Sequence, residues 1–271
     1  MAREPPDRSS DQPSDESSDG SWADLRRLTA ARIALPRSGA SLATGPLLEF
    51  RLDHARARDA VHAPLDEARL VADLAGLGLP VLAVASAAHD RQHYLMRPDL
   101  GRSLAPEAAA MLAAHTGTGS SHDVAFVVSD GLSARAVQAH ARPLLAEVLP
   151  RLRSERWSIA PLVVVRHGRV AIGDAIATAL HARIVVMLIG ERPGLSAPDS
   201  MGAYLTLLPA GRPMTETTDA DRNCISNIRP EGLGSADAAF KLVNLLRAIR
   251  SRGMSGVQLK DDGDRLLIAE R

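Results

Sequence analysis

Short, continuous apolar runs in the second half of the chain predict buried β-strands. Three of these runs are rich in β-branched residues and cover residues 124–128, 162–165 and 184–189. A run of this length and composition is typical of a strand that is buried on both faces. A fourth, weaker run covers residues 203–208, and a long loop is expected from Pro209 to Gly234.

Helical periodicity follows the strands in alternation. Apolar residues recur every three or four positions in residues 134–149, 172–180 and 235–250, as expected for helices that pack one face on a core. Strands that alternate with helices in this way form a parallel sheet covered on both faces. The expected class is therefore α/β, with a Rossmann-like parallel sheet and helices on both of its faces.

The first half of the chain has a different pattern. Its spacing predicts helices near residues 22–34, 47–63 and 65–77 and one short strand at 80–85. Residues 1–20 are rich in Pro, Ser and Asp without apolar periodicity, which is typical of a disordered tail. We therefore divide the chain into this tail (1–20), a mostly helical region (21–115) and a Rossmann-like domain (116–271).

Composition narrows the class of function. The 32 basic and 32 acidic residues give zero formal net charge, and aromatic residues make up only 3%, so neither a basic footprint nor a base-stacking surface for nucleic acid is expected. No apolar run reaches the ~18 residues that a transmembrane helix needs, and no secretory signal is recognised. The single cysteine, Cys224, excludes an internal disulfide and indicates a reducing compartment.

Polar residues and glycines follow each of the three strongest strands. Asp130, His167 and Glu191 stand there, in SDG, RHG and GERPG. Ligands of open α/β sheets bind beyond the carboxyl ends of the strands, which makes these residues candidates for a site. Asp130 could equally cap the helix that follows it, and His167 taken alone is more simply explained as a turn residue.

Two polar stretches resist assignment to regular structure. Residues 89–104 are dense in charge and fit a solvated loop, and residues 217–233 contain Cys224. A lone cysteine is most often a small buried hydrophobic residue, but a loop this long is commonly functional. Motifs for dinucleotides, for a P-loop, for zinc, for a nucleophile elbow and for base-off cobalamin (D-x-H-x-x-G) are all absent from the sequence.

Seven motifs taken together resemble the small subunit family of ethanolamine ammonia-lyase. They are DLRRLTAARI, LLEFRLDHARARDAV, YLMRPDLGR, VVSDGLS, RHGRV, IGERPGL and DRNCISNI, and they occur in the family's order over residues 24–250. The resemblance implies a hetero-oligomer with a large TIM-barrel subunit that holds the substrate. Such a complex converts ethanolamine to acetaldehyde and ammonia with adenosylcobalamin, and the small subunit helps to bind the cobalamin.

The resemblance also implies three cofactor contacts: Val170 of the G-R-V motif, Glu191 of G-E-R-P-G and Cys224 of D-R-x-C-I-S-N-I. It implies a base-on cofactor, no catalytic residue on this chain and no metal ligand from it. Because residues 1–20 lack an amphipathic address segment, we expect the cytoplasm rather than a bacterial microcompartment. The rival hypothesis is a free-standing protein of doubly wound fold that binds a small ligand without catalysis.

Overall fold

The computed structural model describes residues 22, 24–29, 31–115, 121–208 and 217–260. The predicted disordered tail lies outside the described residues. The chain divides between Asp53 and His54 into two compact units. In the first unit, residues 24–27 are helical and strands β1 (Arg37–Ser38) and β2 (Ser41–Leu42) pair as a short antiparallel hairpin.

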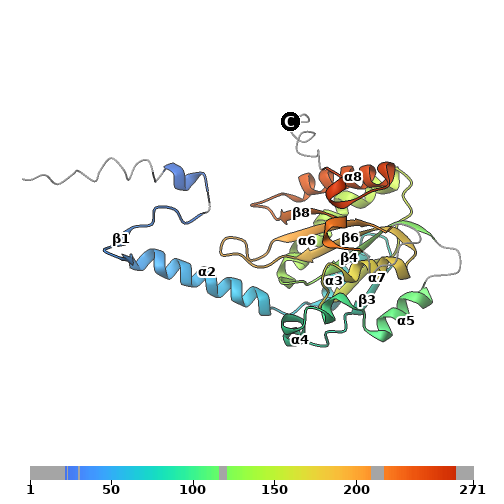
Figure 1. The fold of residues 1–271 in the computed structure, drawn as a ribbon, viewed down its shortest axis with the longest axis horizontal. Coiled ribbons are helices and arrows are strands. Elements are labelled where there is room, and N and C mark those ends of the chain that lie inside the picture. The colour runs from blue at the N-terminus through green and yellow to red at the C-terminus, as the bar shows by residue number, and fades with distance from the viewer. Residues whose placement is uncertain (1–21, 23, 30, 116–120, 209–216, 261–271) are drawn as a thin grey trace, which may run out of the picture. The chain divides into compact units, whose positions relative to one another are not determined.

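The second unit is built on one six-stranded sheet, which Figure 1 shows among its helices. The strands lie in the order β3-β5-β4-β6-β7-β8. Their bounds are β3 Val81–Ala85, β4 His122–Ser129, β5 Leu162–Arg166, β6 Ala182–Gly190, β7 Met201–Leu207 and β8 Arg222–Ile228. Strands β3, β5, β4 and β6 are parallel, whereas β7 runs antiparallel to β6 and β8 antiparallel to β7.

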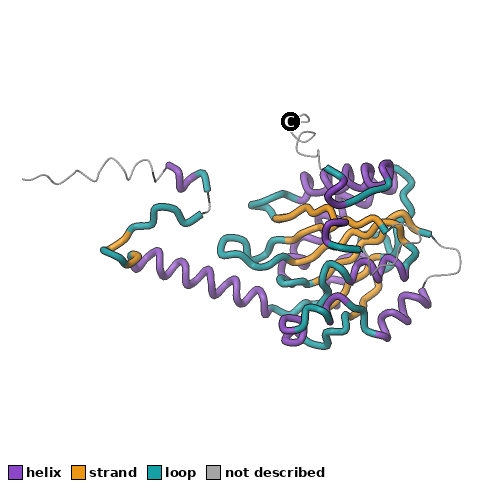
Figure 2. Tube along the Cα trace, viewed as in Figure 1, coloured by secondary structure: helices purple, strands orange, loops and turns teal. Residues whose placement is uncertain are grey.

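Helices cover both faces of this sheet (Figure 2). The bounds of the α-helices are α2 Thr44–His62, α3 Glu67–Ala75, α4 Arg91–Met96, α5 Pro106–His115, α6 Ala134–Ser154, α7 Ile172–Ala179 and α8 Ser235–Arg252. Short 3-10 helices are η1 Leu100–Arg102, η3 Asp219–Asp221 and η4 Gly256–Gln258. Helices α3, α6 and α8 pack on one face, and α5 and α7 pack on the other.

Alternation along the central strands explains the two cores. Val124, Phe126 and Val128 of β4 point toward α6 and α8, whereas Ala125 and Val127 point toward α5 and α7. All five side chains are fully buried. Burial on both faces requires a continuous apolar run rather than an alternating one, which is the pattern that the sequence shows.

The predicted α/β class with helices on both faces is confirmed, with two differences. The sheet is mixed, because its last two strands are antiparallel. Strand β8 also falls inside the loop predicted from Pro209 to Gly234, so the prediction of a loop around Cys224 was wrong. In addition, β3 pairs with β5, so residues on both sides of position 115 contribute to one sheet.

The stretch 89–104, which fitted a solvated loop, has regular structure. Helix α4 begins after Asp90, whose carboxylate accepts a hydrogen bond from the backbone N–H of His93 at 2.8 Å. Tyr94 of this helix is completely buried. Within the part of the chain that the structure describes, no helix is long and apolar enough to cross a membrane.

Candidate functional site

The chain reverses direction across the sheet at the carboxyl ends of β4 and β5. The connection after β4 leads to α6 on one face, and the connection after β5 leads to α7 on the other. A crevice that opens between two such strands is the usual ligand site of an open α/β sheet. Asp130 and His167, which the sequence marked, lie at this point.

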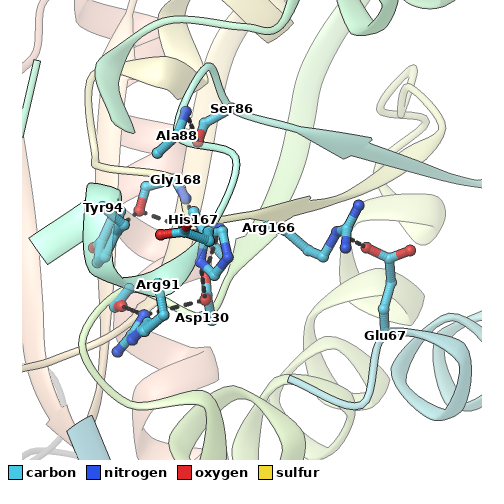
Figure 3. Close-up of polar contacts among 12 residues, drawn as sticks. Glu67, Ser86, Ala88, Arg91, Tyr94, Asp130, Arg166, His167 and Gly168 are labelled. Atoms are coloured by element: carbon cyan, nitrogen blue, oxygen red, sulfur yellow. Dashed lines mark hydrogen bonds and ion pairs between the residues drawn. The ribbon is translucent and has the colours of Figure 1, made fainter. Parts of the chain in front are cut away.

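The Asp130 carboxylate holds this junction together (Figure 3). It accepts hydrogen bonds from the backbone N–H of His167 at 2.7 Å and from Arg91 Nη1 at 3.2 Å. The His167 ring lies against the same carboxylate, with Nδ1 3.2 Å from Oδ2. Three segments, the ends of β4 and β5 and the start of α4, are therefore tied to one buried acid.

These contacts give Asp130 a structural role and not a capping role. Helix α6 is capped by Ser133, whose hydroxyl accepts from the backbone N–H of Ala136 at 3.4 Å. The Ser129 hydroxyl accepts a hydrogen bond from the backbone N–H of Gly168 at 3.0 Å. A hydroxyl that is engaged in this way does not fit the role of a nucleophile. His167 has φ +57, in the left-handed region. A residue other than glycine keeps this conformation when the surrounding contacts fix it. Side chains of α4 thus occupy the crevice that a ligand would use in other doubly wound proteins.

A cavity of about 620 Å³ lies to one side of this junction. It is formed by the start of α7, the turn around η1 and strands β7 and β8. Its lining residues are Pro98, Arg102, Arg169, Val170, Ala171, Tyr204, Thr217, Thr218, Asp219, Arg222 and Cys224. Two of the three predicted cofactor residues, Val170 and Cys224, are thus brought together from distant parts of the sequence.

Cys224 lies on β8 directly opposite Tyr204 of β7. The residue is exposed, which does not fit the alternative of a small buried hydrophobic cysteine, and its thiol lies against Tyr204. Desolvation raises the pKa of the Cys224 thiol, and the nearby Glu191 charge raises it further, whereas a hydrogen bond from Tyr204 works in the opposite direction. A thiol whose pKa is raised stays protonated at neutral pH, which suits a contact and not a nucleophile.

Glu191 follows β6 and is not among the residues that line the cavity, but it lies beside them. Its Oε2 accepts from the Ser200 hydroxyl at 2.6 Å and from the backbone N–H of Asn227 at 3.3 Å. A Cβ at Gly202 would lie 2.8 Å from Glu191 Oε1 and 3.2 Å from the Tyr204 ring. The glycine therefore leaves room for this carboxylate next to Tyr204, on the face of β7 that borders the cavity.

A buried ion pair fixes the two walls of the cavity relative to each other. Arg222 of β8 donates from both terminal nitrogens to Asp174 of α7, at 2.8 and 2.7 Å, and also to the Thr206 hydroxyl at 2.9 Å. The Arg222 and Asp174 side chains are only 4% and 6% exposed. The bidentate pair ties α7, which follows Val170 directly, to the strand that carries Cys224.

One group of side chains has the spacing of metal ligands. Ligand atoms of His89, Asp90 and His93 lie within 4.8 Å of one another. The Asp90 carboxylate already caps α4, and hydrogen bonds from the backbone and ring of His93 lower its pKa to about 2. A capping carboxylate explains this arrangement, so we assign no ion to it.

Comparison with known proteins identifies the family of this chain. The model of the ethanolamine ammonia-lyase light chain family (EutC) matches residues 19–260. The chain is 55% identical over 244 residues to the ethanolamine ammonia-lyase small subunit of Azotobacter vinelandii, with 90% of this chain and 89% of the relative covered. It is 54% identical to the small subunits of Ralstonia nicotianae, with 89% of this chain and 88% of the relative covered, and of Xanthomonas campestris, with 91% and 90% covered. The chain therefore belongs to the family of ethanolamine ammonia-lyase small subunits.

Proposed function

We propose that this chain supplies one wall of an adenosylcobalamin site in a hetero-oligomer with the ethanolamine ammonia-lyase large subunit. Val170, Glu191 and Cys224 are the contacts that we assign to the cofactor. The observation that carries the proposal is that Val170 and Cys224 line one cavity, with Glu191 beside it. The large subunit holds ethanolamine in this division of labour.

The residues of the cavity fit an amphipathic cofactor. Val170, Ala171 and Pro98 offer apolar surface, and Tyr204 and the Thr217 and Thr218 hydroxyls offer hydrogen bonds. Cobalamin combines an apolar ring with amide side chains, and a site for it needs both kinds of surface. Glu191 keeps acceptor capacity on Oε1 for amide N–H groups, because its hydrogen bonds from Ser200 and Asn227 both fall on Oε2. When bound, the cofactor supplies an adenosyl radical by homolysis of its cobalt–carbon bond.

The size of the cavity supports a shared site. Cavities of ~300–1,000 Å³ enclose drug-sized ligands, and adenosylcobalamin is considerably larger than these. A volume of about 620 Å³ covers only part of such a molecule. A partner must then supply the remaining contacts, which is why we place the site at a boundary between subunits. The cofactor stays base-on, because the sequence lacks the histidine motif that replaces the base.

The test is a cofactor titration of the complex formed with the large subunit. A charge-assisted hydrogen bond is worth about 1.5–3 kcal/mol, so Glu191→Ala should weaken adenosylcobalamin binding roughly ten- to a hundredfold. Glu147→Ala is the matched control, because Glu147 is an exposed acid of α6 that forms a surface pair with Arg151. An unchanged affinity in a folded Glu191→Ala complex would refute the assignment of this residue.

A second measurement separates the proposal from the rival of a free-standing binding protein. The purified chain should not deaminate ethanolamine and should bind adenosylcobalamin weakly, since half a site loses contacts but still bears the entropic cost of association. Addition of the large subunit should restore both tight binding and turnover. Tight, stoichiometric binding by the chain alone would favour the rival.

A further inference from the structure

Two arginines of the cavity lack the acidic partners that the neighbouring arginine has. Arg222 is neutralised by Asp174 and lies near Asp219. Among the described residues, no carboxylate lies within ion-pair distance of Arg169 or Arg102, although both line the same cavity. Cations without counter-ions in a concave site attract an anion, because low-dielectric walls strengthen their field.

Contacts with Tyr94 hold the Arg169 side chain in place. The guanidinium lies over the Tyr94 ring, 4.2 Å from its centroid, and Nη2 donates to the Tyr94 carbonyl oxygen at 3.0 Å. Arg169 Nε is buried and makes no hydrogen bond. The other terminal nitrogen, Nη1, makes no hydrogen bond to described residues either and remains for a ligand.

The backbone brings the two arginines together. The Arg169 N–H donates to the carbonyl oxygen of Gly101 at 2.7 Å, and Arg102 is the next residue. Gly101 is needed for this contact, because a Cβ there would lie 2.8 Å from Arg169 Cγ and 3.1 Å from the Tyr94 ring. The β5–α7 connection and η1 are thus clamped together with their arginines on the rim of one cavity.

We propose that Arg169 and Arg102 form an anion subsite that receives the phosphodiester of the cofactor's nucleotide tail. This inference rests on the proposed function, since it takes adenosylcobalamin as the ligand. The phosphodiester is the one anionic group in the tail of that molecule. Arginine is well suited to bind it, because the planar guanidinium can offer parallel N–H donors to phosphate oxygens.

The test compares two ligands on the complex with the large subunit. Adenosylcobalamin carries the phosphodiester, whereas adenosylcobinamide has the same corrin and adenosyl group but lacks phosphate and base. Arg169→Met and Arg102→Met should each weaken adenosylcobalamin binding about tenfold, the size expected for one charge-assisted hydrogen bond. Binding of adenosylcobinamide should stay within about twofold of the unmodified complex, measured by absorbance titration.

Controls keep this result interpretable. Arg69→Met removes an exposed arginine of α3 and should change neither affinity, and circular dichroism checks folding because Arg169 packs on buried Tyr94. Arg102 is exposed, so Arg102→Met provides a variant with little structural risk. Adenosylcobalamin affinity should also fall less steeply with salt in Arg169→Met, since one screened attraction is gone.

The outcomes separate this subsite from the proposed function. Equal weakening of both ligands, or no weakening of either, in folded arginine variants would overturn the anion subsite. If the unmodified complex binds adenosylcobalamin and Glu191→Ala weakens it, the proposed function still stands in that case. If the unmodified complex binds neither ligand, the proposed function itself fails.

Discussion

Replacement of Asp174 by Asn tests how the cavity is held together. In the native chain each carboxylate oxygen of Asp174 accepts one N–H of Arg222. An asparagine keeps the shape but presents an amide N–H₂ to one of these donors. The Arg222 charge would remain buried, and the acid that still lies near it among the described residues is Asp219, at 3.4 Å and 94% exposed. Breaking a buried pair from one side costs about 3–5 kcal/mol.

We expect a loss near the lower end of that range, about 3 kcal/mol, because Asp219 and Thr206 still face the guanidinium. In a chain of this size each kcal/mol lowers the melting temperature by roughly 2–4 °C. Asp174→Asn should therefore melt roughly 6–12 °C below the unmodified chain, as followed by circular dichroism. Its complex with the large subunit should also bind adenosylcobalamin more weakly, since α7 and β8 are no longer tied.

Two further variants decide whether the pair is the cause. Asp73→Asn removes an acid that pairs with Arg69 at 3.8 Å on the surface, and it should cost less than about 1 kcal/mol. The double variant Asp174→Asn with Arg222→Met should recover part of the loss, because no buried charge remains. An Asp174→Asn melting temperature within about 2 °C of that of the unmodified chain would refute the reasoning, because a loss of about 3 kcal/mol corresponds to a larger decrease. A double variant whose loss of stability equals the sum of the two single losses would refute it as well.

Four smaller predictions concern the cavity rim and the N-terminus. Gly202→Ala should weaken adenosylcobalamin binding by about tenfold, because the new methyl group displaces the Glu191 carboxylate; a titration that matches the unmodified complex would contradict this. Iodoacetamide should modify Cys224 slowly at neutral pH and faster only above the usual thiol range, since its pKa is raised. Tyr204→Phe should move that rate profile to still higher pH, because it removes a hydrogen bond that lowers the pKa, and a shift to lower pH would refute the assignment. Deletion of residues 1–20 should leave the yield of soluble complex unchanged, because this segment has no apolar periodicity with which to dock.

The central strands could be predicted from sequence because their burial is two-sided. Residues 184–189 are apolar at every position, and both faces of β6 are covered by helices. Edge strand β8 could not be recognised in the same way. Its buried positions include Ile225 and Ile228, but polar residues separate them, and the strand is defined by its pairing with β7. Pairing with a neighbouring strand leaves no local periodicity to detect.

Helix α6 shows a different limit of local rules. The sequence predicted a helix over residues 134–149, yet the helix continues to Ser154 with Pro143 and Pro150 inside it. Proline removes one backbone hydrogen bond in a helix, but Leu149 and Leu152 are buried in the core on both sides of Pro150. Tertiary packing on the sheet outweighs the local penalty here.

The candidate site was also predicted only in part from local sequence. Val170, Glu191 and Cys224 could be named because short motifs carry them, but the sequence did not show that Val170 and Cys224 share a cavity. Arg102 and Arg169 were passed over, since only the backbone contact between Gly101 and Arg169 brings them together. A short motif predicts which residue types belong to a site. Which distant loops lie next to each other depends on the order and register of the strands.

The filled crevice at the β4–β5 junction explains why the cavity lies elsewhere. In other open α/β proteins a ligand binds at the position that lies between Asp130 and His167 in this chain. Here Arg91 and Tyr94 take that place, because Arg91 donates a hydrogen bond to Asp130 and the Tyr94 hydroxyl donates one to the Gly168 carbonyl oxygen. The free surface then lies beside the start of α7, where antiparallel strands β7 and β8 extend the sheet beyond β6. The addition of these two strands creates the second wall, so Cys224 and Tyr204 can face Val170 across a cavity that a purely parallel sheet ending at β6 would lack.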